Sequence, residues 1–183
     1  MFEIIFEEER CLFNNDTAEL IYCKPITLQF EHSLISISKW EERYKKTFLD
    51  EDYNKTEDEI TYYLWCMSIK TIDYKYILAL NEDERLALIN YTNEKRTATV
   101  VPHKQEHITI KETITSELVY FWMIEYHIPY EARTWNITRL MALIDICQYK
   151  KSPSEKKTEA EIASEYSSEN ARRKEELKKR GLL

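Results

Sequence analysis

The motif whose residue types most resemble a catalytic site spans residues 103–107, His-Lys-Gln-Glu-His. It matches the H-x-x-E-H arrangement of some zinc peptidases. In those enzymes the motif lies on a helix, so that both histidines bind zinc from one face and the glutamate activates a water molecule. Here Val-Val-Pro comes before the motif and Ile-Thr-Ile after it, which is typical of strands. We therefore interpret 103–107 as a polar loop. No other spacing indicates a metal, cofactor or catalytic site, so we predict that the chain is not an enzyme.

Glycine is nearly absent, and this excludes several enzyme classes. The only glycine is Gly181. Phosphate-binding loops and dinucleotide-binding turns need several glycines, because their backbone must turn tightly and approach the ligand closely. The sequence therefore argues against kinases, NTPases and nicotinamide-dependent enzymes.

A second group of residues has the chemistry of protein interfaces. Two helices are expected on either side of Pro129, and we call the bend between them the elbow. Around it the sequence places Trp122, Tyr126 and Trp135, with Arg139 close by. Aromatic side chains and arginine are the usual anchors of protein–protein contacts. The same residues also fit a hydrophobic core from which the arginine reaches solvent. The sequence leaves both interpretations open.

The basic stretch 171–180 is a further candidate surface and includes Arg172 and Arg173. Such a stretch suits an acidic protein or nucleic acid, although its interspersed glutamates are also typical of a solvated helix face. The two helices expected around the elbow also suggest a DNA-binding helix-turn-helix, but only Arg139 is clearly basic on the second helix. Because residues 1–132 are strongly acidic and phosphate would repel them, we disfavour nucleic acid as a partner.

Composition indicates a soluble protein of a reducing cytosol. Charged residues make up 32% of the chain, and the formal net charge is −7. No apolar run approaches the roughly 18 residues of a membrane-spanning helix, and the acidic residues near the start exclude a signal peptide. The four cysteines are widely spaced within apolar segments, so we expect buried free thiols rather than disulfides.

Residues 115–151 hold the densest apolar sequence, and we expect the fold to be organised around them. Thr115 and Ser116 can cap a helix, and the run 118–124 is wholly apolar or aromatic, which predicts a helix with protein on most sides. Pro129 should end this helix. A second helix is expected from near Thr134, with a buried stripe at helical spacing, formed by Ile137, Leu140, Met141, Ile144 and Cys147.

The preceding chain alternates between strand and helix signals. Residues 1–37 show period-two alternation with a turn at 14–16, which predicts a small antiparallel sheet. Helices are expected at about 38–48, after Thr56 with its capping partner Glu59, and across 73–93, where Asn81 and Glu84 repeat that capping pattern. Strands near 97–101 and 108–111 should form a hairpin or a longer loop.

These signals predict an α+β fold that is mainly helical. A small N-terminal antiparallel β-sheet should occupy residues 1–37. A mainly helical core domain should follow at 38–152, with a β-hairpin near 97–112. Residues 153–183 contain few large apolar side chains, so we expect a loose, charged C-terminal helix or tail there.

Three stretches of the sequence carry a family resemblance. They are ISISKWEERYKKTFL at 35–49, ITSELVYFWMIEYHIPYEARTWNITRLMALIDIC at 114–147 and NARRKEELKKRG at 170–181. In content, order and spacing these blocks resemble proteins encoded in the tail modules of tailed double-stranded DNA bacteriophages, and in particular tail assembly chaperones. The stretch 70–110 has no counterpart in this resemblance.

The resemblance implies a non-catalytic function in virion morphogenesis. Tail assembly chaperones coat the aggregation-prone tape measure protein and help to deliver tail tube subunits, so those two proteins are the implied partners. The family defines no catalytic or ligand residues to transfer. The same blocks also suit a virion structural or connector protein, and a nucleic-acid-binding regulator is a further alternative. Whether the chain forms a homo-oligomer is left open.

Overall fold

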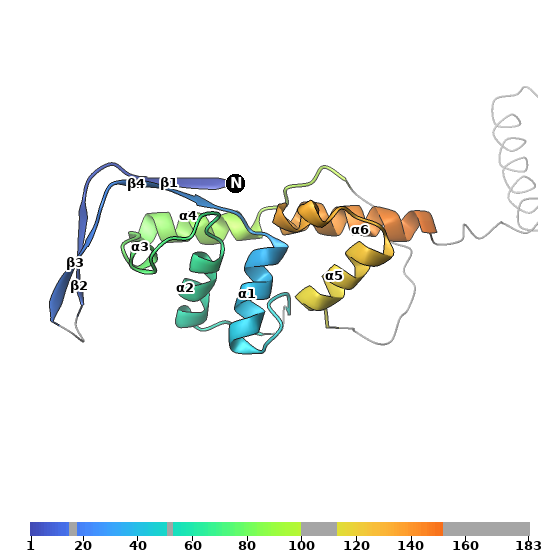
Figure 1. The fold of residues 1–183 in the computed structure, drawn as a ribbon, viewed down its shortest axis with the longest axis horizontal. Coiled ribbons are helices and arrows are strands. Elements are labelled where there is room, and N and C mark those ends of the chain that lie inside the picture. Colours follow the sequence, from blue (N-terminus) through green and yellow to red (C-terminus); the bar gives the residue numbers. More distant parts are fainter. Residues whose placement is uncertain (15–17, 51–52, 100–112, 152–183) are drawn as a thin grey trace, which may run out of the picture. The chain divides into compact units, whose positions relative to one another are not determined.

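Two antiparallel β-ribbons begin the chain in the computed structural model, which describes residues 1–14, 18–50, 53–99 and 113–151 (Figure 1). Strand β1 (Phe2–Phe6) pairs with β4 (Ile26–Phe30), and β2 (Arg10–Asn14) pairs with β3 (Glu19–Cys23). The pleat buries alternate side chains of the first ribbon, where Ile4 lies opposite Leu28. The predicted N-terminal β-structure is confirmed, although it consists of two two-stranded sheets rather than one.

Helices make up most of the remaining described chain, so the fold is α+β and mainly helical. They are α1 (Leu34–Tyr44), α2 (Glu57–Cys66), α3 (Lys75–Leu78), α4 (Glu82–Asn93), α5 (Ser116–Glu125), the 3₁₀ helix η1 (Tyr130–Thr134) and α6 (Ile137–Lys151). Contacts divide the chain into two units, Met1–Cys147 and Gln148–Leu183. The predicted divisions after residues 37 and 152 stay predictions.

Helix starts agree with the capping signals at three places. Thr56 and Glu59 form a reciprocal capping box at α2, and Asn81 and Glu84 form another at α4. Thr115 caps α5 by accepting a hydrogen bond from the backbone of Leu118. Each cap satisfies a backbone N–H that the helix itself leaves unpaired.

The first helix lies four residues earlier than predicted. We expected it at about 38–48, but Ser33 is its N-cap and its side chain accepts a hydrogen bond from the backbone of Ser36. The helix ends where Lys45 takes a left-handed backbone conformation with φ of 55°. The physical reason for the difference is that residues 34–37 alternate like a strand, whereas the cap at Ser33 starts a helix there.

One hydrophobic core joins the ribbons to the helices of the first unit. Trp40 of α1 is fully buried, and its indole Nε1 donates a hydrogen bond to the carbonyl of Glu59, 2.9 Å away. Phe48 stacks on Tyr63 of α2 with ring centroids 3.9 Å apart. Figure 1 shows α1 and α2 side by side, and the two helices are in contact. Helix α1 therefore packs on α2, while the ribbons contact α3 and α4.

Arg10 anchors the bend between the two ribbons. Its guanidinium forms a bidentate pair with Glu84 at the start of α4, with both N–O distances 2.6 Å, and also donates to the carbonyl of Ala79. The same group lies 3.6 Å from the ring centroid of Phe6. Bidentate pairing fixes orientation as well as distance, so Arg10 holds the β2–β3 ribbon against the segment between α3 and α4.

Two sets of predictions have different outcomes. Burial of the free cysteines is confirmed for Cys23 and Cys66, whereas Cys147 is half-buried and Cys11 is exposed. The reason is that Cys11 lies on the outward face of β2. The expected hairpin near 97–112, the motif at 103–107, and the tail with Arg172 and Arg173 fall largely or wholly outside the described residues, although 97–99 is described and is not strand.

A chain that ends after Lys151 is expected to keep its melting temperature within about 3 °C of the full-length value. The reason is that every buried hydrophobic residue of the described chain lies between Ile4 and Ile144. Calorimetry of both forms measures the change. A control chain that ends after Asn136 should fail to fold, because it lacks the buried residues of α6. A loss of more than about 10 °C in the first truncation would contradict this prediction.

Candidate functional site

Helix α5 is tied to the core at its first residue. The buried carboxylate of Glu41 on α1 accepts a hydrogen bond from the backbone N–H of Ser116 through Oε2 at 2.8 Å. Its Oε1 accepts one from the backbone N–H of Phe48 at 2.9 Å. A carboxylate at a helix N-terminus satisfies free N–H groups and interacts favourably with the helix dipole. Glu41 therefore determines where α5 starts relative to α1.

Only one face of α5 is covered by the described residues. Ser116, Val119 and Met123 are buried at helical spacing, whereas Phe121 is 57% exposed and Ile124 is 77% exposed. The prediction that protein surrounds most of this helix is therefore wrong at Phe121 and Ile124, while the other residues of the run 118–124 are buried or half-buried. The run 118–124 is apolar all round, but α1 covers one side of the helix and no described element covers the opposite side.

The elbow between α5 and α6 has more structure than predicted. Helix α5 ends at Glu125, the left-handed His127 turns the chain, and Pro129 precedes η1. The second helix starts at Ile137 rather than near Thr134, because Asn136 provides the cap: its Oδ1 accepts a hydrogen bond from the backbone of Thr138 at 3.1 Å. The break at Pro129 is confirmed, and the intervening 3₁₀ turn explains the later start.

The predicted interface residues fall into two structural groups. Trp122 and Tyr126 are half-buried and pack against the core. Trp135 is 41% exposed, and the guanidinium of Arg139 lies 5.6 Å from its ring centroid. The structure therefore brings Trp135 and Arg139 together at the surface.

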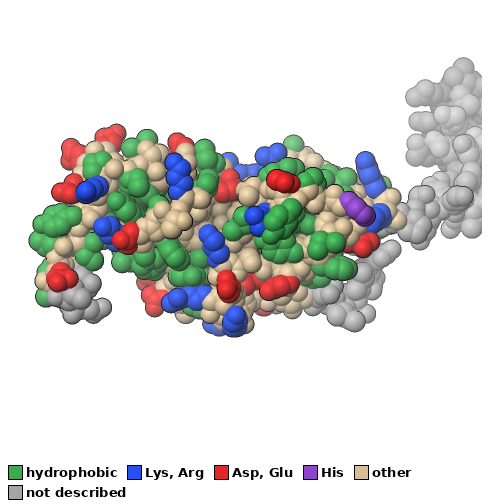
Figure 2. Space-filling model, in the orientation of Figure 1, with side chains coloured by type: hydrophobic (Ala, Val, Ile, Leu, Met, Phe, Trp, Pro, Cys, Tyr) green, Lys and Arg blue, Asp and Glu red, His purple; other side chains and the backbone are tan. Residues whose placement is uncertain are grey.

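Three exposed residues of the same region were not predicted. Besides Phe121 and Ile124, Tyr130 of η1 is exposed, and its ring lies 6.2 Å from that of Tyr120 on α5. Arg133 lies over the Tyr130 ring at 3.9 Å. Figure 2 shows hydrophobic side chains gathered over the part of the molecule where Figure 1 draws α5. The sequence carried no signal for this exposure, because an unbroken apolar run does not show which side faces the core.

We call this set the elbow surface, and it consists of Phe121, Ile124, Tyr130, Arg133, Trp135 and Arg139. Its chemistry is apolar and aromatic with two arginines. Helix α6 carries Arg139, and its residues Ile137, Leu140 and Ile144 are buried as the predicted stripe requires. Met141 and Cys147 of that stripe are only half-buried. The elbow surface has the composition of interface anchors rather than of a reactive centre.

Burial affects the ionisation of one tyrosine beside this surface. The partly buried position of Tyr120 raises the pKa of its hydroxyl, with the charge of neighbouring Tyr130 acting in the same direction. The hydroxyl therefore stays protonated near neutral pH and is available as a hydrogen-bond donor.

Neither metal-binding nor membrane-spanning features occur in the part of the chain that the structure describes. Within residues 1–14, 18–50, 53–99 and 113–151, no three His, Cys, Asp or Glu side chains converge as metal ligands. None of the helices described there is long and apolar enough to cross a membrane. Comparisons of the chain with protein-family models, curated proteins and solved structures found no match.

Proposed function

We propose that this chain is a non-catalytic binding protein of bacteriophage tail assembly, a chaperone that holds the tape measure protein and tail tube subunits in the host cytoplasm. The observation that carries the proposal is the elbow surface, where large apolar and aromatic side chains face solvent on a helix held at its start by Glu41. The sequence resemblance of blocks 35–49, 114–147 and 170–181 to tail-module proteins supports the same role.

The elbow surface has the chemistry that an amphipathic helix of a partner requires. Such helices place apolar side chains at three- and four-residue spacing into an apolar surface. On α5 the exposed Phe121 and Ile124 follow the same spacing and give a matching stripe. Its two arginines, Arg133 over Tyr130 and Arg139 near Trp135, favour partner segments that carry carboxylates beside their apolar stripe.

The net charge fits a protein that keeps an aggregation-prone partner in solution. The formal charge of −7 gives mutual repulsion between complexes. A partner bound at an apolar surface of the chaperone would share this repulsion, because the complex carries the charge of both proteins.

Exchanging both exposed apolar residues of α5 for glutamine, in the variant Phe121→Gln with Ile124→Gln, is expected to reduce capture of the tape measure protein at least about tenfold. Stability should change little, because both side chains already face solvent and glutamine is a good helix former. Affinity-tagged protein from infected cells, analysed by quantitative mass spectrometry, measures the capture. The matched control is Leu86→Gln, which replaces a 51% exposed apolar residue on α4 and should retain full capture.

The same experiment separates a chaperone from a permanent virion component. Mass spectrometry of purified virions should not detect the protein if it leaves the assembled tail. Presence at a fixed copy number would instead identify a structural or connector protein. Equal capture by the α5 variant and the control would refute the elbow surface as the binding site, and salt-sensitive retention on DNA would favour the nucleic-acid alternative.

A further inference from the structure

An open cleft of about 680 Å³ lies along α2, among residues that the elbow surface does not include. Its lining combines four aromatic side chains with charged groups of both signs, and the residues that matter are Arg43, Tyr44, Asp58, Tyr62, Trp65 and Tyr74. They come from the end of α1, from α2 and from the residue before α3. A cleft of this size accommodates a short peptide segment or a small ligand.

The aromatic residues of the cleft form a continuous row. The ring centroids of Tyr44 and Tyr62 are 5.6 Å apart, those of Tyr62 and Trp65 are 5.5 Å apart, and those of Trp65 and Tyr74 are 6.0 Å apart. All four side chains are half-buried, so each ring has one part in the protein and another open to solvent. A row of ring faces offers several stacking positions in sequence rather than one enclosed pocket.

Hydrogen bonds hold the row in place. The indole Nε1 of Trp65 donates to the carbonyl of Ile72 at 2.9 Å, which fixes the ring against the segment before α3. At the other end, the capping box of Thr56 and Glu59 fixes the start of α2, and Trp40 donates to the carbonyl of Glu59 from the core side. Trp65 and the start of α2 are therefore fixed before any ligand binds, which lowers the entropic cost of binding there.

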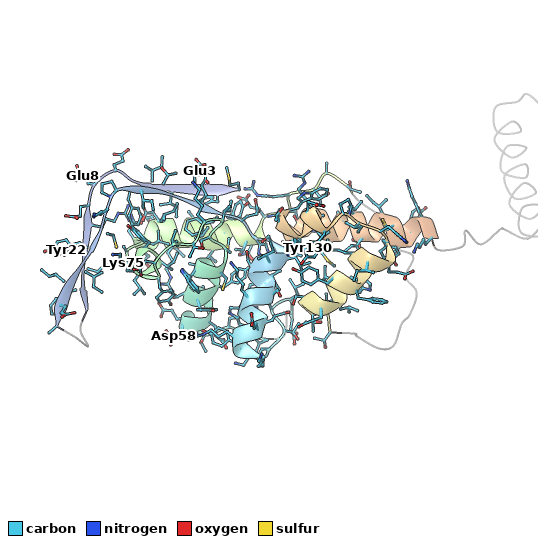
Figure 3. All side chains as sticks on the ribbon, viewed as in Figure 1. Glu3, Glu8, Tyr22, Asp58, Lys75 and Tyr130 are labelled. Atoms are coloured by element: carbon cyan, nitrogen blue, oxygen red, sulfur yellow. The ribbon has the colours of Figure 1, made fainter. Side chains whose placement is uncertain are left out.

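Of the three acidic residues at the start of α2, one has a carboxylate that is available to pair with a ligand. Glu59 pairs with Lys46 at 2.8 Å, and Glu57 lies 3.5 Å from Arg85. Asp58, which is exposed, makes no ion pair with any residue described in the structure. Figure 3 shows Asp58 at the start of α2, where the chain presents three consecutive acidic residues.

We propose that this cleft binds an extended, proline-containing peptide segment that carries a basic residue. Such segments adopt the polyproline II conformation, and their proline rings dock between aromatic side chains in shallow grooves. The row from Tyr44 to Tyr74 supplies the docking faces, and Asp58 is placed to pair with the lysine or arginine of the segment. The site is distinct in its residues from the elbow surface.

The charges of the cleft argue against other occupants. Bases of single-stranded nucleic acid also stack on aromatic rings, but the carboxylate of Asp58 at the cleft would repel the phosphates. A lone cation held by the rings would compete with Arg43, whose guanidinium already lies 4.5 Å from the Tyr62 centroid. A peptide that docks its proline rings on Trp65 and Tyr74 and pairs its basic residue with Asp58 leaves Arg43 in place over Tyr62.

Nuclear magnetic resonance titration of the full chain tests this proposal. The probe is a short proline peptide with one central arginine, and the expected result is a dose-dependent shift of the Trp65 indole N–H signal. A Gly/Ser peptide with the same arginine should cause no such shift, because it lacks the proline rings. The Asp58→Asn variant should bind the arginine peptide about threefold more weakly and bind an all-proline peptide unchanged.

The matched control is Asp83→Asn. Asp58 and Asp83 are both exposed and occupy the same position in the first turn after a capping box, on α2 and α4 respectively. Asp83→Asn should therefore reproduce any effect on helix stability and leave peptide affinity unchanged. Equal weakening by both variants, no shift at Trp65, or preferential binding of a thymidine oligonucleotide or an oligosaccharide would overturn the proposal. The α5 glutamine variant should bind the peptide normally, so failure here is separate from failure of the proposed function.

Discussion

Replacing Glu41 by glutamine is expected to lower the free energy of unfolding by about 2 kcal/mol. Its two carboxylate oxygens accept hydrogen bonds from the backbone N–H groups of Phe48 and Ser116, and both its side chain and Ser116 are buried. Glutamine has the same shape but presents one oxygen and one NH₂ group. One of the two N–H groups would then face another donor without access to water, which is costly.

Denaturant titration of the wild type and Glu41→Gln measures this effect, and the melting temperature should fall by about 6 °C. The control is Glu42→Gln, the next residue on α1, whose side chain is exposed. It should change the unfolding free energy by less than about 0.5 kcal/mol. Because Glu41 holds the start of α5, its variant should also weaken binding at the elbow surface. Equal stability of the two variants would show that Glu41 does not tether α5.

Lowering the pH from about 7 to about 5 is expected to remove about 2 kcal/mol of stability through His32. Burial lowers the pKa of this histidine from 6.5 to about 4, although the charge of Glu31 opposes the shift. The folded state therefore resists protonation, whereas the unfolded chain takes up the proton below about 6.5. Stability from the neutral imidazole is present above that value and is lost as the pH falls towards 4.

The reason for the low pKa is the position of the ring. His32 is buried in the segment between β4 and α1, where its Nδ1 forms a hydrogen bond with the hydroxyl of Tyr63 on α2. Its ring also lies 6.2 Å from that of Phe48. Protonation would place a charge in this largely aromatic environment without a directly hydrogen-bonded carboxylate, which is unfavourable.

Unfolding measurements across this pH range should show a much smaller slope for His32→Gln, because glutamine retains hydrogen-bonding capacity but does not titrate. The control is His127→Gln at an exposed position, which should keep the wild-type slope. The carboxylate of Glu59 affects stability in a lower pH range than His32 does. Hydrogen bonds from Lys46 and the backbone of Thr56 lower the pKa of Glu59 to about 2, so its contribution is lost only below about 4.5. A wild-type slope in His32→Gln would exclude His32 as the titrating group.

Local signals in the sequence predicted much of the secondary structure. The capping pairs Thr56 with Glu59 and Asn81 with Glu84 located the starts of two helices correctly, because a cap depends on residues within one turn. The period-two alternation within residues 1–37 likewise predicted the first ribbon. The start of α1 was missed where a strand-like alternation at 34–37 competed with the cap at Ser33.

The candidate site was only partly predictable. Trp135 and Arg139 were identified from residue type, and the structure places them together at the surface. Phe121, Ile124 and Tyr130 were not, and neither was the aromatic row along α2. Residues of that row are spread from Tyr44 to Tyr74, so their proximity depends on how α1, α2 and the segment before α3 pack.

By itself, the sequence determined the acidic charge, the α+β class and the caps that start α2, α4 and α5, since each depends on composition or on neighbours within a few residues. Only the tertiary structure decided which side of α5 faces solvent and how Glu41 reaches Ser116 across 75 positions. The physical reason is that burial is a property of packed surfaces. A helix that is apolar on every side has no preferred inner face until another element covers one of them.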